Sequence, residues 1–285
     1  MKKTAQPCVD FSILGAENSL MTTAMSETPY STLIVETVDN IRVIRLNRPE
    51  RMNAVVKPLY DDLLKALHEA EKDDQIKAVL LTGNGRAFCA GADLKAHKEG
   101  RTPEEKAVYL AAEQDVCRKI FTLSKPVVAA VNGYAIGAGF EMALNCDFIV
   151  MADTAQMSLP EVDLGTFVGG GVSWLLPRMV GLPAARKLLF GEIHSRDDLP
   201  ANRLTAAMAE EFGLVTRIIP IDNFLNGAME FTRKLANKPI HSVQKMKAII
   251  REGFEQTYEQ ALEAELNEMI ECSSSEDWQK TVSKQ

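Results

Sequence analysis

The stretch PVVAAVNGYAIGAGFEMALNCDFIVMA, Pro126–Ala152, carries the clearest indication of how this chain folds. It opens with PVVAAV and closes with DFIVMA, two continuous apolar runs of strand length. Runs of this kind, without polar alternation, are typical of strands in a parallel sheet that is buried on both faces. Between them, a glycine-rich turn leads into an apolar helix that carries one acid, Glu141. Glu141 is either a first-turn acid favoured by the helix dipole or a charge held beside a ligand.

Outward from this stretch, short apolar runs alternate with helical patterns, as they do in α/β proteins. The run TLIVETVDNIRVIRLNRP predicts a hairpin that turns at Asp39-Asn40. Two further strands are predicted within 76–83 and 214–220. Helices are predicted at about 57–72 and 104–123 and then, with no strand between them, at about 222–236, 240–251 and 255–272.

These patterns divide the chain into three parts. Residues 1–28 are interpreted as a flexible N-terminal extension, because their longest apolar run is too short and too interrupted for a secretory signal. Residues 29–220 are predicted to form an α/β core. Residues 221–285 are predicted to form an all-helical C-terminal region.

The composition argues against several classes of partner. The chain of 285 residues has a formal net charge of -7 and no basic stripe, which argues against nucleic acid. No apolar run approaches the roughly 18 residues that cross a membrane. The cysteines are odd in number and widely spaced, which is typical of free thiols in a reducing compartment, so we expect a cytoplasmic location. They are Cys8, Cys89, Cys117, Cys146 and Cys272.

A second segment of interest, GRAFCAGADLKAH, runs from Gly85 to His97 directly after a predicted strand. Gly91 permits a sharp turn of the backbone, and Asp93 is placed to cap a short helix that starts at Leu94. Such a turn can leave the N–H of Ala92 without a partner inside the protein. Taken alone, the segment also fits an ordinary connection between a strand and a helix.

The third segment, SLPEVDLGTFVGGGVSW, runs from Ser158 to Trp174 and carries Glu161 after a proline. Three consecutive glycines follow, and then the start of another predicted helix. No lysine follows the glycines, so this is not a phosphate-binding loop for a nucleoside triphosphate. Taken alone, the segment is typical of a surface loop.

Together the three segments resemble the crotonase (enoyl-CoA hydratase/isomerase) superfamily. AFCAGADLK is similar to the first oxyanion segment of that family, the stretch from Lys125 to Ala152 to its second, and LPEVDLG to its second acid loop. The resemblance implies a crotonase-like α/β fold, with repeated ββα units in a spiral core and a C-terminal helical oligomerisation region. It also implies a homotrimer or a dimer of trimers.

The resemblance further implies an acyl-CoA thioester substrate, no separate cofactor and no metal. The two oxyanion donors of the family correspond to the main-chain N–H groups of Ala92 and Ala138, and its water-holding glycine to Gly169. Hydratases of the family carry two glutamates at the positions of Glu141 and Glu161. We therefore expect hydration of a 2-enoyl-CoA in fatty acid metabolism, with Glu141 as the base towards water and Glu161 as the acid towards carbon.

Other members of the family use the same enolate for isomerisation, specialised dehydration or decarboxylation, and some are non-catalytic scaffolds. These alternatives stay open. The resemblance also assigns substrate binding to two segments around the oxyanion donors and to an adenine-side loop. The residues concerned are Arg51, Met52, Ala54, Ala90, Gly91, Asp93, Leu94, Lys95 and Gly137. Residues 192–204 look like an insertion relative to the family.

Overall fold

The computed structural model describes residues 30–93, 100, 102–193 and 202–283. Its strands form two sheets, one of six strands and one of four. The strands are β1 (Leu33–Val38), β2 (Ile41–Leu46), β3 (Ala78–Gly83), β4 (Ala87–Cys89), β5 (Val127–Val131), β6 (Tyr134–Ile136), β7 (Phe148–Ala152), β8 (Gln156–Ser158), β9 (Leu204–Thr205) and β10 (Arg217–Ile219).

The larger sheet has the strand order β1-β2-β3-β5-β7-β10. β1 and β2 form the predicted hairpin and pair in antiparallel fashion across Asp39 and Asn40. From β2 onward every neighbouring pair is parallel. All residues of β3 and β5 are buried, as expected for apolar strands that are covered on both faces. The predicted parallel sheet is confirmed, with β1 as an antiparallel edge.

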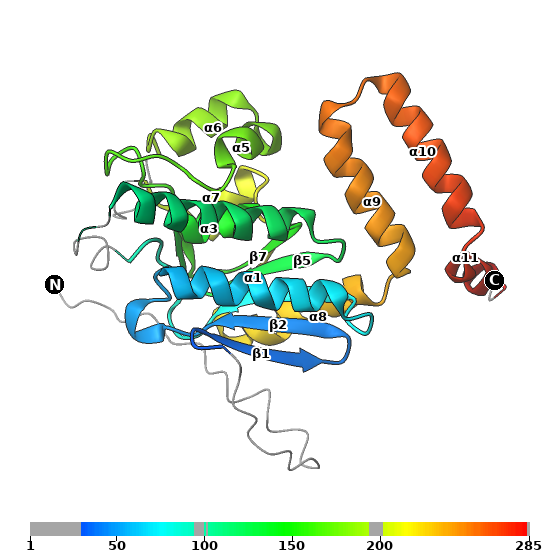
Figure 1. Cartoon of the computed structure of the whole chain (residues 1–285), viewed down its shortest axis with the longest axis horizontal. Helices are drawn as coiled ribbons and strands as arrows, with labels where there is room; N and C mark the ends of the chain where they lie inside the picture. Colours follow the sequence, from blue (N-terminus) through cyan, green and yellow to red (C-terminus); the bar gives the residue numbers. More distant parts are fainter. Residues whose placement is uncertain (1–29, 94–99, 101, 194–201, 284–285) are drawn as a thin grey trace, which may run out of the picture.

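Helices cover both faces of this sheet (Figure 1). α1 and α3 pack against each other, and α8 lies along β2, β3, β5 and β7. The α-helices are α1 (Lys57–Lys72), α3 (Pro103–Thr122), α4 (Ala138–Leu144), α5 (Val172–Val180), α6 (Leu182–Leu189), α7 (Ala206–Glu211), α8 (Phe224–Ala236), α9 (Ile240–Glu252), α10 (Tyr258–Ser273) and α11 (Glu276–Val282). Short 3-10 turns are Pro49–Arg51, Ile221–Asn223 and Gly253–Glu255.

The smaller sheet has the order β4-β6-β8-β9 and follows directly from the larger one. β3 leads into β4, β5 into β6 and β7 into β8, each after a few residues. Asn132 fixes the corner between the sheets, because its side chain accepts from the N–H of Gly83 at 3.1 Å and donates to the carbonyl of Gly85 at 2.8 Å. After each turn into the second sheet, the chain enters a loop or helix that carries candidate site residues.

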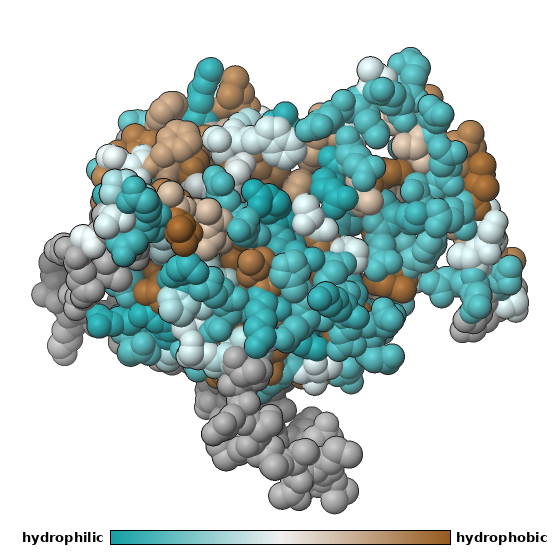
Figure 2. All heavy atoms as spheres, viewed as in Figure 1, coloured by the Kyte–Doolittle hydropathy of each residue, from teal (hydrophilic) through white to brown (hydrophobic). Residues whose placement is uncertain are grey.

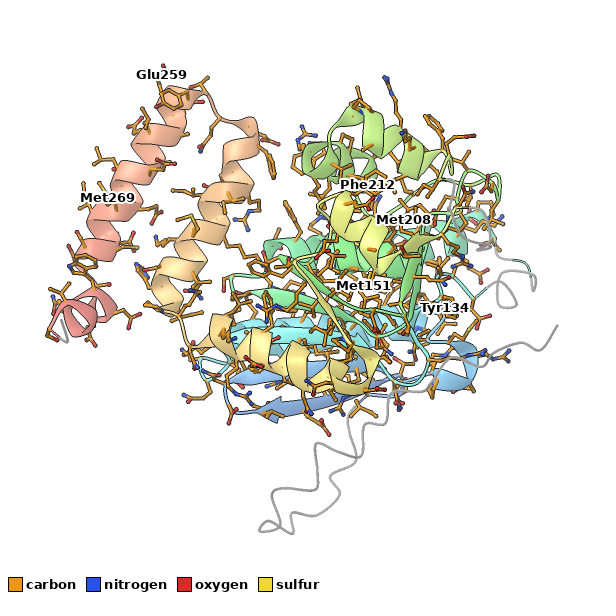
Figure 3. All side chains as sticks on the ribbon, turned by 180° about the vertical axis from the view of Figure 1, so that it is seen from behind. Tyr134, Met151, Met208, Phe212, Glu259 and Met269 are labelled. Carbon is orange, nitrogen blue, oxygen red and sulfur yellow. The ribbon has the colours of Figure 1, made fainter. Side chains whose placement is uncertain are left out.

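The helices that follow residue 221 are confirmed as a series without an intervening strand. α9, α10 and α11 stand to one side of the sheets (Figure 1). Apolar side chains line the outer edge of α10 (Figure 2), and Met269 lies there on the side away from α9 (Figure 3). Within the described ranges, no helix is both long and apolar enough to span a lipid bilayer. Most of the predicted insertion lies outside the described residues.

Candidate active site

The first two sequence segments meet where the chain leaves β4 and β6. Gly91 has a φ of +84°, and a Cβ on it would lie 2.8 Å from the carbonyl oxygen of Ile136 and 3.9 Å from the nitrogen of Ala138. Only glycine combines this left-handed conformation with so close an approach of two backbones. The fold thus brings together the two segments that the resemblance paired, although 47 residues separate Gly91 from Ala138 in the sequence.

The main-chain N–H groups around this contact are mostly occupied. Asp93 donates to the carbonyl of Val55 at 3.0 Å, and Gly137 donates to that of Ser158 at 2.9 Å. Ala138 is the first residue of α4, so its N–H has no acceptor within the helix. No described residue accepts a hydrogen bond from the main-chain N–H of Ala92 or of Ala138. Two donors are therefore left available near the contact between the segments.

Glu141 is buried in the first turn of α4, with 2% of its surface exposed. Its Oε2 accepts the N–H of Gly169 at 2.9 Å and that of Gly170 at 2.5 Å. The pKa of Glu141 is raised to about 8, first by burial and then by the neighbouring Glu113 carboxyl, while the two N–H donors oppose the rise. Glu141 is therefore not a solvated first-turn acid, because the glycine loop holds it inside the protein.

Glu161 is also buried, although Val162 and Asp163, the next two residues, are exposed. Its Oε1 lies 2.6 Å from the position that a Cβ on Gly137 would occupy, so its carboxyl sits beside the second segment. Its Oε2 is buried without a hydrogen-bond partner among the described residues. Burial raises the pKa of Glu161 as well. The loop that taken alone looked like a surface loop delivers one acid inward.

A third acid, Glu113 on α3, joins the two predicted ones. Its side chain is buried, and its Oε2 and Cδ lie 3.2 and 3.3 Å from where a Cβ on Gly169 would be. The pKa of Glu113 is raised to about 7, mainly by burial, with the Tyr60 hydroxyl opposing the rise and the charge of Glu161 contributing to it. Sequence reasoning missed Glu113. Its signal was an acid at helical spacing from the apolar residues Tyr109 and Ile120.

The predicted adenine-side loop packs against the first segment. Ala90 donates its N–H to the carbonyl of Met52 at 3.0 Å, and Val55 donates to that of Gly91 at 2.7 Å. The side chain of Asp93 pairs with Arg48 at 3.3 Å, a partner that was not predicted. Ala54 is half-buried in this loop, whereas Arg51 is exposed. Leu94 and Lys95 lie outside the described residues.

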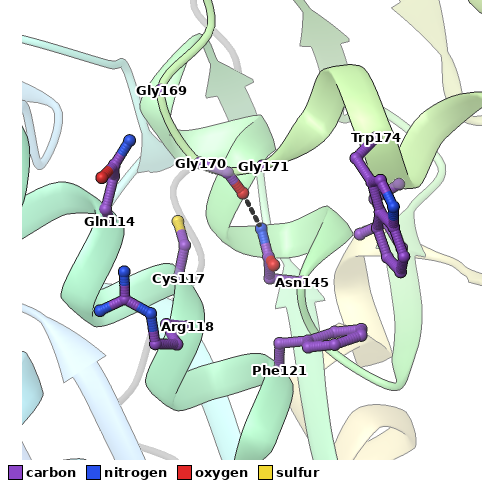
Figure 4. A pocket seen from close by; sticks show the side chains of 10 residues that line it. Gln114, Cys117, Arg118, Phe121, Asn145, Gly169, Gly170, Gly171 and Trp174 are labelled. Atoms are coloured by element: carbon purple, nitrogen blue, oxygen red, sulfur yellow. Dashed lines mark hydrogen bonds between the residues drawn. The ribbon is translucent and has the colours of Figure 1, made fainter. Parts of the chain in front are cut away.

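A cavity of about 330 Å³ adjoins the glycine loop (Figure 4). It is lined by Gly169 to Gly171 and by side chains from α3 and α5, among them Cys117, Phe121 and Trp174. Asn145 donates to the carbonyl of Gly170 at 2.8 Å, as the dashed line in Figure 4 marks. α4 and its C-cap thus hold the loop at two points, Asn145 through the carbonyl of Gly170 and Glu141 through the N–H groups of Gly169 and Gly170.

The sequence of this chain is similar to those of known enoyl-CoA hydratases and isomerases. The model of the enoyl-CoA hydratase/isomerase family matches residues 36–284. The chain is 33% identical over 246 residues to the short-chain-enoyl-CoA hydratase of Clostridium acetobutylicum, covering 86% of this chain and 90% of that protein. It is 31% identical over 246 residues to the 1,2-epoxyphenylacetyl-CoA isomerase of Escherichia coli, covering 85% of this chain and 90% of that protein.

Solved structures agree with the sequence relatives. The crystal structure of an enoyl-CoA hydratase from Polaromonas sp. JS666 superimposes with a TM-score of 0.82 at 28% identity, covering 88% of this chain and 95% of that one. The resemblance inferred from three short segments therefore extends over nearly the whole described fold, including the C-terminal helices. The chain belongs to the enoyl-CoA hydratase/isomerase family, the crotonase superfamily.

Proposed function

We propose that this protein is an enoyl-CoA hydratase, which adds water across the 2,3 double bond of a 2-enoyl-CoA thioester without a separate cofactor. The observation that carries the proposal is the pair of buried acids, Glu141 and Glu161, beside a contact that leaves two main-chain N–H groups available. The hydratase and isomerase names of the relatives support acyl-CoA chemistry in general. The two acids favour hydration among the reactions of the family.

The N–H groups of Ala92 and Ala138 are proposed to bind the thioester oxygen. Attack of water on C3 moves negative charge onto that oxygen, and donors that are already in place stabilise it without reorganisation. Loss of one such donor in other enzymes costs about 2.7–4 kcal/mol of transition-state stabilisation. The position of Ala138 at the start of α4 supports this role, because helix starts carry unsatisfied N–H groups.

Glu141 and Glu161 are proposed to divide the proton transfers. One carboxylate removes a proton from the attacking water, and the other, as a carboxylic acid, delivers a proton to C2. Both acids are buried and both pKa values are raised, which favours a state in which the pair retains one proton near neutral pH. The assignment of Glu141 to the water and of Glu161 to C2 stays a prediction.

We also propose that the chain assembles as a homotrimer or a dimer of trimers. The support is a set of exposed apolar side chains on α10, including Leu262, Leu266 and Met269, which water solvates poorly in an isolated chain. We further propose a cytoplasmic location, which the free thiols of Cys89, Cys117 and Cys146 support. A role in fatty acid metabolism follows from the proposed thioester substrate.

The experiment that tests the proposal is a hydration assay with purified protein. Loss of the absorbance of the conjugated thioester near 260–280 nm, together with mass-spectrometric detection of a 3-hydroxyacyl-CoA, is the expected result. Formation of a 3-enoyl-CoA without water uptake would identify an isomerase instead. Tight binding of 2-enoyl-CoAs with no conversion would identify a scaffold.

A further inference from the structure

Glu113 places a carboxyl in the buried core, where folding alone would favour an apolar side chain. It lies on the face of α3 that carries the buried residues Tyr109, Val116, Cys117 and Ile120. Only 7% of its surface is exposed, so the carboxyl loses most of its hydration. An apolar side chain would pack at this position without that cost. Packing alone therefore gives no reason for a carboxyl at this position.

The surroundings of Glu113 are polar, and the donor that they offer its carboxyl is the Tyr60 hydroxyl. The Tyr60 hydroxyl lies close enough to lower the pKa of Glu113, yet it forms no hydrogen bond of ordinary geometry with any described residue. Tyr60 itself is fully buried. The described groups that act on the pKa of Glu113 are Tyr60 and Glu161, and neither is a cation. A carboxyl and a hydroxyl thus lie buried together, and Tyr60 is the one described side chain whose hydrogen bonding lowers the pKa of Glu113, a carboxyl with two acceptor oxygens.

Glu113 borders the proposed site of reaction. Its carboxyl oxygen lies 3.2 Å from where a Cβ on Gly169 would be, and Gly169 is the residue whose N–H Glu141 accepts. Electrostatic coupling links Glu113 to both Glu141 and Glu161. Within the described part of the chain, no acids or other side chains are grouped so that they could hold a metal ion. A substrate whose C2 and C3 lie between Glu141 and Glu161 would extend past C3 near Glu113.

We propose that Glu113 and Tyr60 form a polar subsite for the acyl chain, which selects 2-enoyl-CoA substrates that carry a hydrogen-bond donor, a hydroxyl or amino group, beyond C3. The inference rests on the proposed hydratase function. A plain alkyl chain would cover the Glu113 carboxyl and leave it no donor besides Tyr60, which is costly for a buried group with two acceptor oxygens. A hydroxyl or amino group would donate to Glu113. Sites built to bind such a group discriminate strongly against analogues that lack it.

The test compares 2-enoyl-CoAs of equal chain length with and without a terminal hydroxyl or amino group. The readout is the ratio of kcat/KM for the polar substrate to kcat/KM for the plain one. Wild type should favour the polar member, and Glu113→Leu should lower the ratio by about tenfold to a hundredfold. Glu113→Gln keeps an acceptor and should retain part of the preference. Asp115→Leu removes an exposed acid from the same helix and should leave the ratio unchanged.

Binding supplies a second readout that does not depend on turnover. Calorimetric Kd values for saturated acyl-CoAs, with and without the terminal hydroxyl, should show the same preference and the same loss in Glu113→Leu. Equal kcat/KM and Kd values of wild type for the polar and the plain acyl-CoA would refute the proposed subsite. An equal loss of affinity for both acyl-CoAs in folded Glu113→Leu would also refute it. If wild type hydrates no enoyl-CoA, the hydratase proposal fails, whereas the calorimetric preference still decides the subsite.

Discussion

Gly169 donates its main-chain N–H to Oε2 of Glu141 at 2.9 Å across 28 residues of sequence. Gly170 adds a second donor to the same oxygen. The orientation of the acid is therefore set by the glycine loop as well as by α4. A side chain at Gly169 would crowd the carboxyl of Glu113, and one at Gly170 would crowd that of Glu141. We therefore expect substitutions in this loop to lower activity.

Gly170→Ala should cut hydration strongly. The added Cβ would lie 2.7 Å from Sγ of Cys117 and 3.0 Å from Oε2 of Glu141, so the loop or the acid must move. A misplacement of about 1 Å can cost roughly a hundredfold in rate. Gly253→Ala is the matched control, because a Cβ there meets nothing within 4 Å. Equal kcat/KM values for the two variants would contradict the role of the loop.

Glu141→Gln and Glu161→Gln should each lower kcat by about 10²–10⁴-fold, since each removes one proton-transfer group. Binding of a saturated acyl-CoA should persist, because the amide keeps the shape of the side chain. Asp163→Asn is the control. It makes the corresponding acid-to-amide change two residues from Glu161, at an exposed side chain that accepts a hydrogen bond from Asn202. Steady-state kinetics and calorimetry measure the two effects. A variant that loses binding but keeps kcat would refute the assigned roles.

Ala138→Pro removes a single N–H from the proposed oxyanion site. Proline is tolerated at the first position of a helix, where the N–H has no partner in any case, so α4 should still form. We expect kcat to fall by about 10²–10³-fold, as for loss of one oxyanion donor. Ala138→Gly keeps the N–H and should retain most activity. A proline variant as active as the glycine variant would exclude this donor from catalysis.

The pH dependence of kcat/KM should show a fall near pH 8. Burial and the Glu113 carboxyl raise the pKa of Glu141 to about 8, so a proton stays on the pair up to that pH. Above that pH the coupled pair loses the proton that its two carboxyls share, so Glu161 has none to deliver to C2. Glu113→Gln removes a neighbouring negative charge, so the pKa of Glu141 should fall and the alkaline limb should move to lower pH. A limb that stays in place or moves upward in this variant would contradict the coupling.

Leu266→Glu should dissociate the oligomer. Leu266 is an exposed apolar residue of α10, and a charge there would be costly to bury against another copy of the chain. Asn267→Glu adds the same charge at the next, also exposed, residue and serves as the control. Light scattering coupled to size-exclusion chromatography measures the mass. A wild-type protein that runs as a monomer would refute the assembly.

Much of the fold was predictable from strong local patterns. The boundaries of α1 match the prediction of 57–72, because leucines at helical spacing and Pro58 near the start define it. The hairpin and the strands of the larger sheet were also found. The smaller sheet was not predicted, because strands of two or three residues, such as β9 and β8, are too short to show a period.

The candidate site was predictable only in part, since its residues meet through the topology. Glu141 stood out as an acid in an apolar helix, whereas Glu161 gained meaning only from the resemblance. Glu113 was missed because α3 carries many acids, and only burial separates it from exposed neighbours such as Glu104 and Asp115. The pairing of Gly91 with Ile136 depends on parallel strands that bring distant turns together, which no local pattern reports.

The proposed mechanism can be tested by a crystal structure with a saturated acyl-CoA bound. The thioester oxygen should lie about 2.7–3.1 Å from the nitrogens of both Ala92 and Ala138. C2 and C3 should lie between the carboxyls of Glu141 and Glu161. A thioester oxygen bound away from these N–H groups, or an acyl chain that leaves either acid out of reach of C2 and C3, would refute the mechanism.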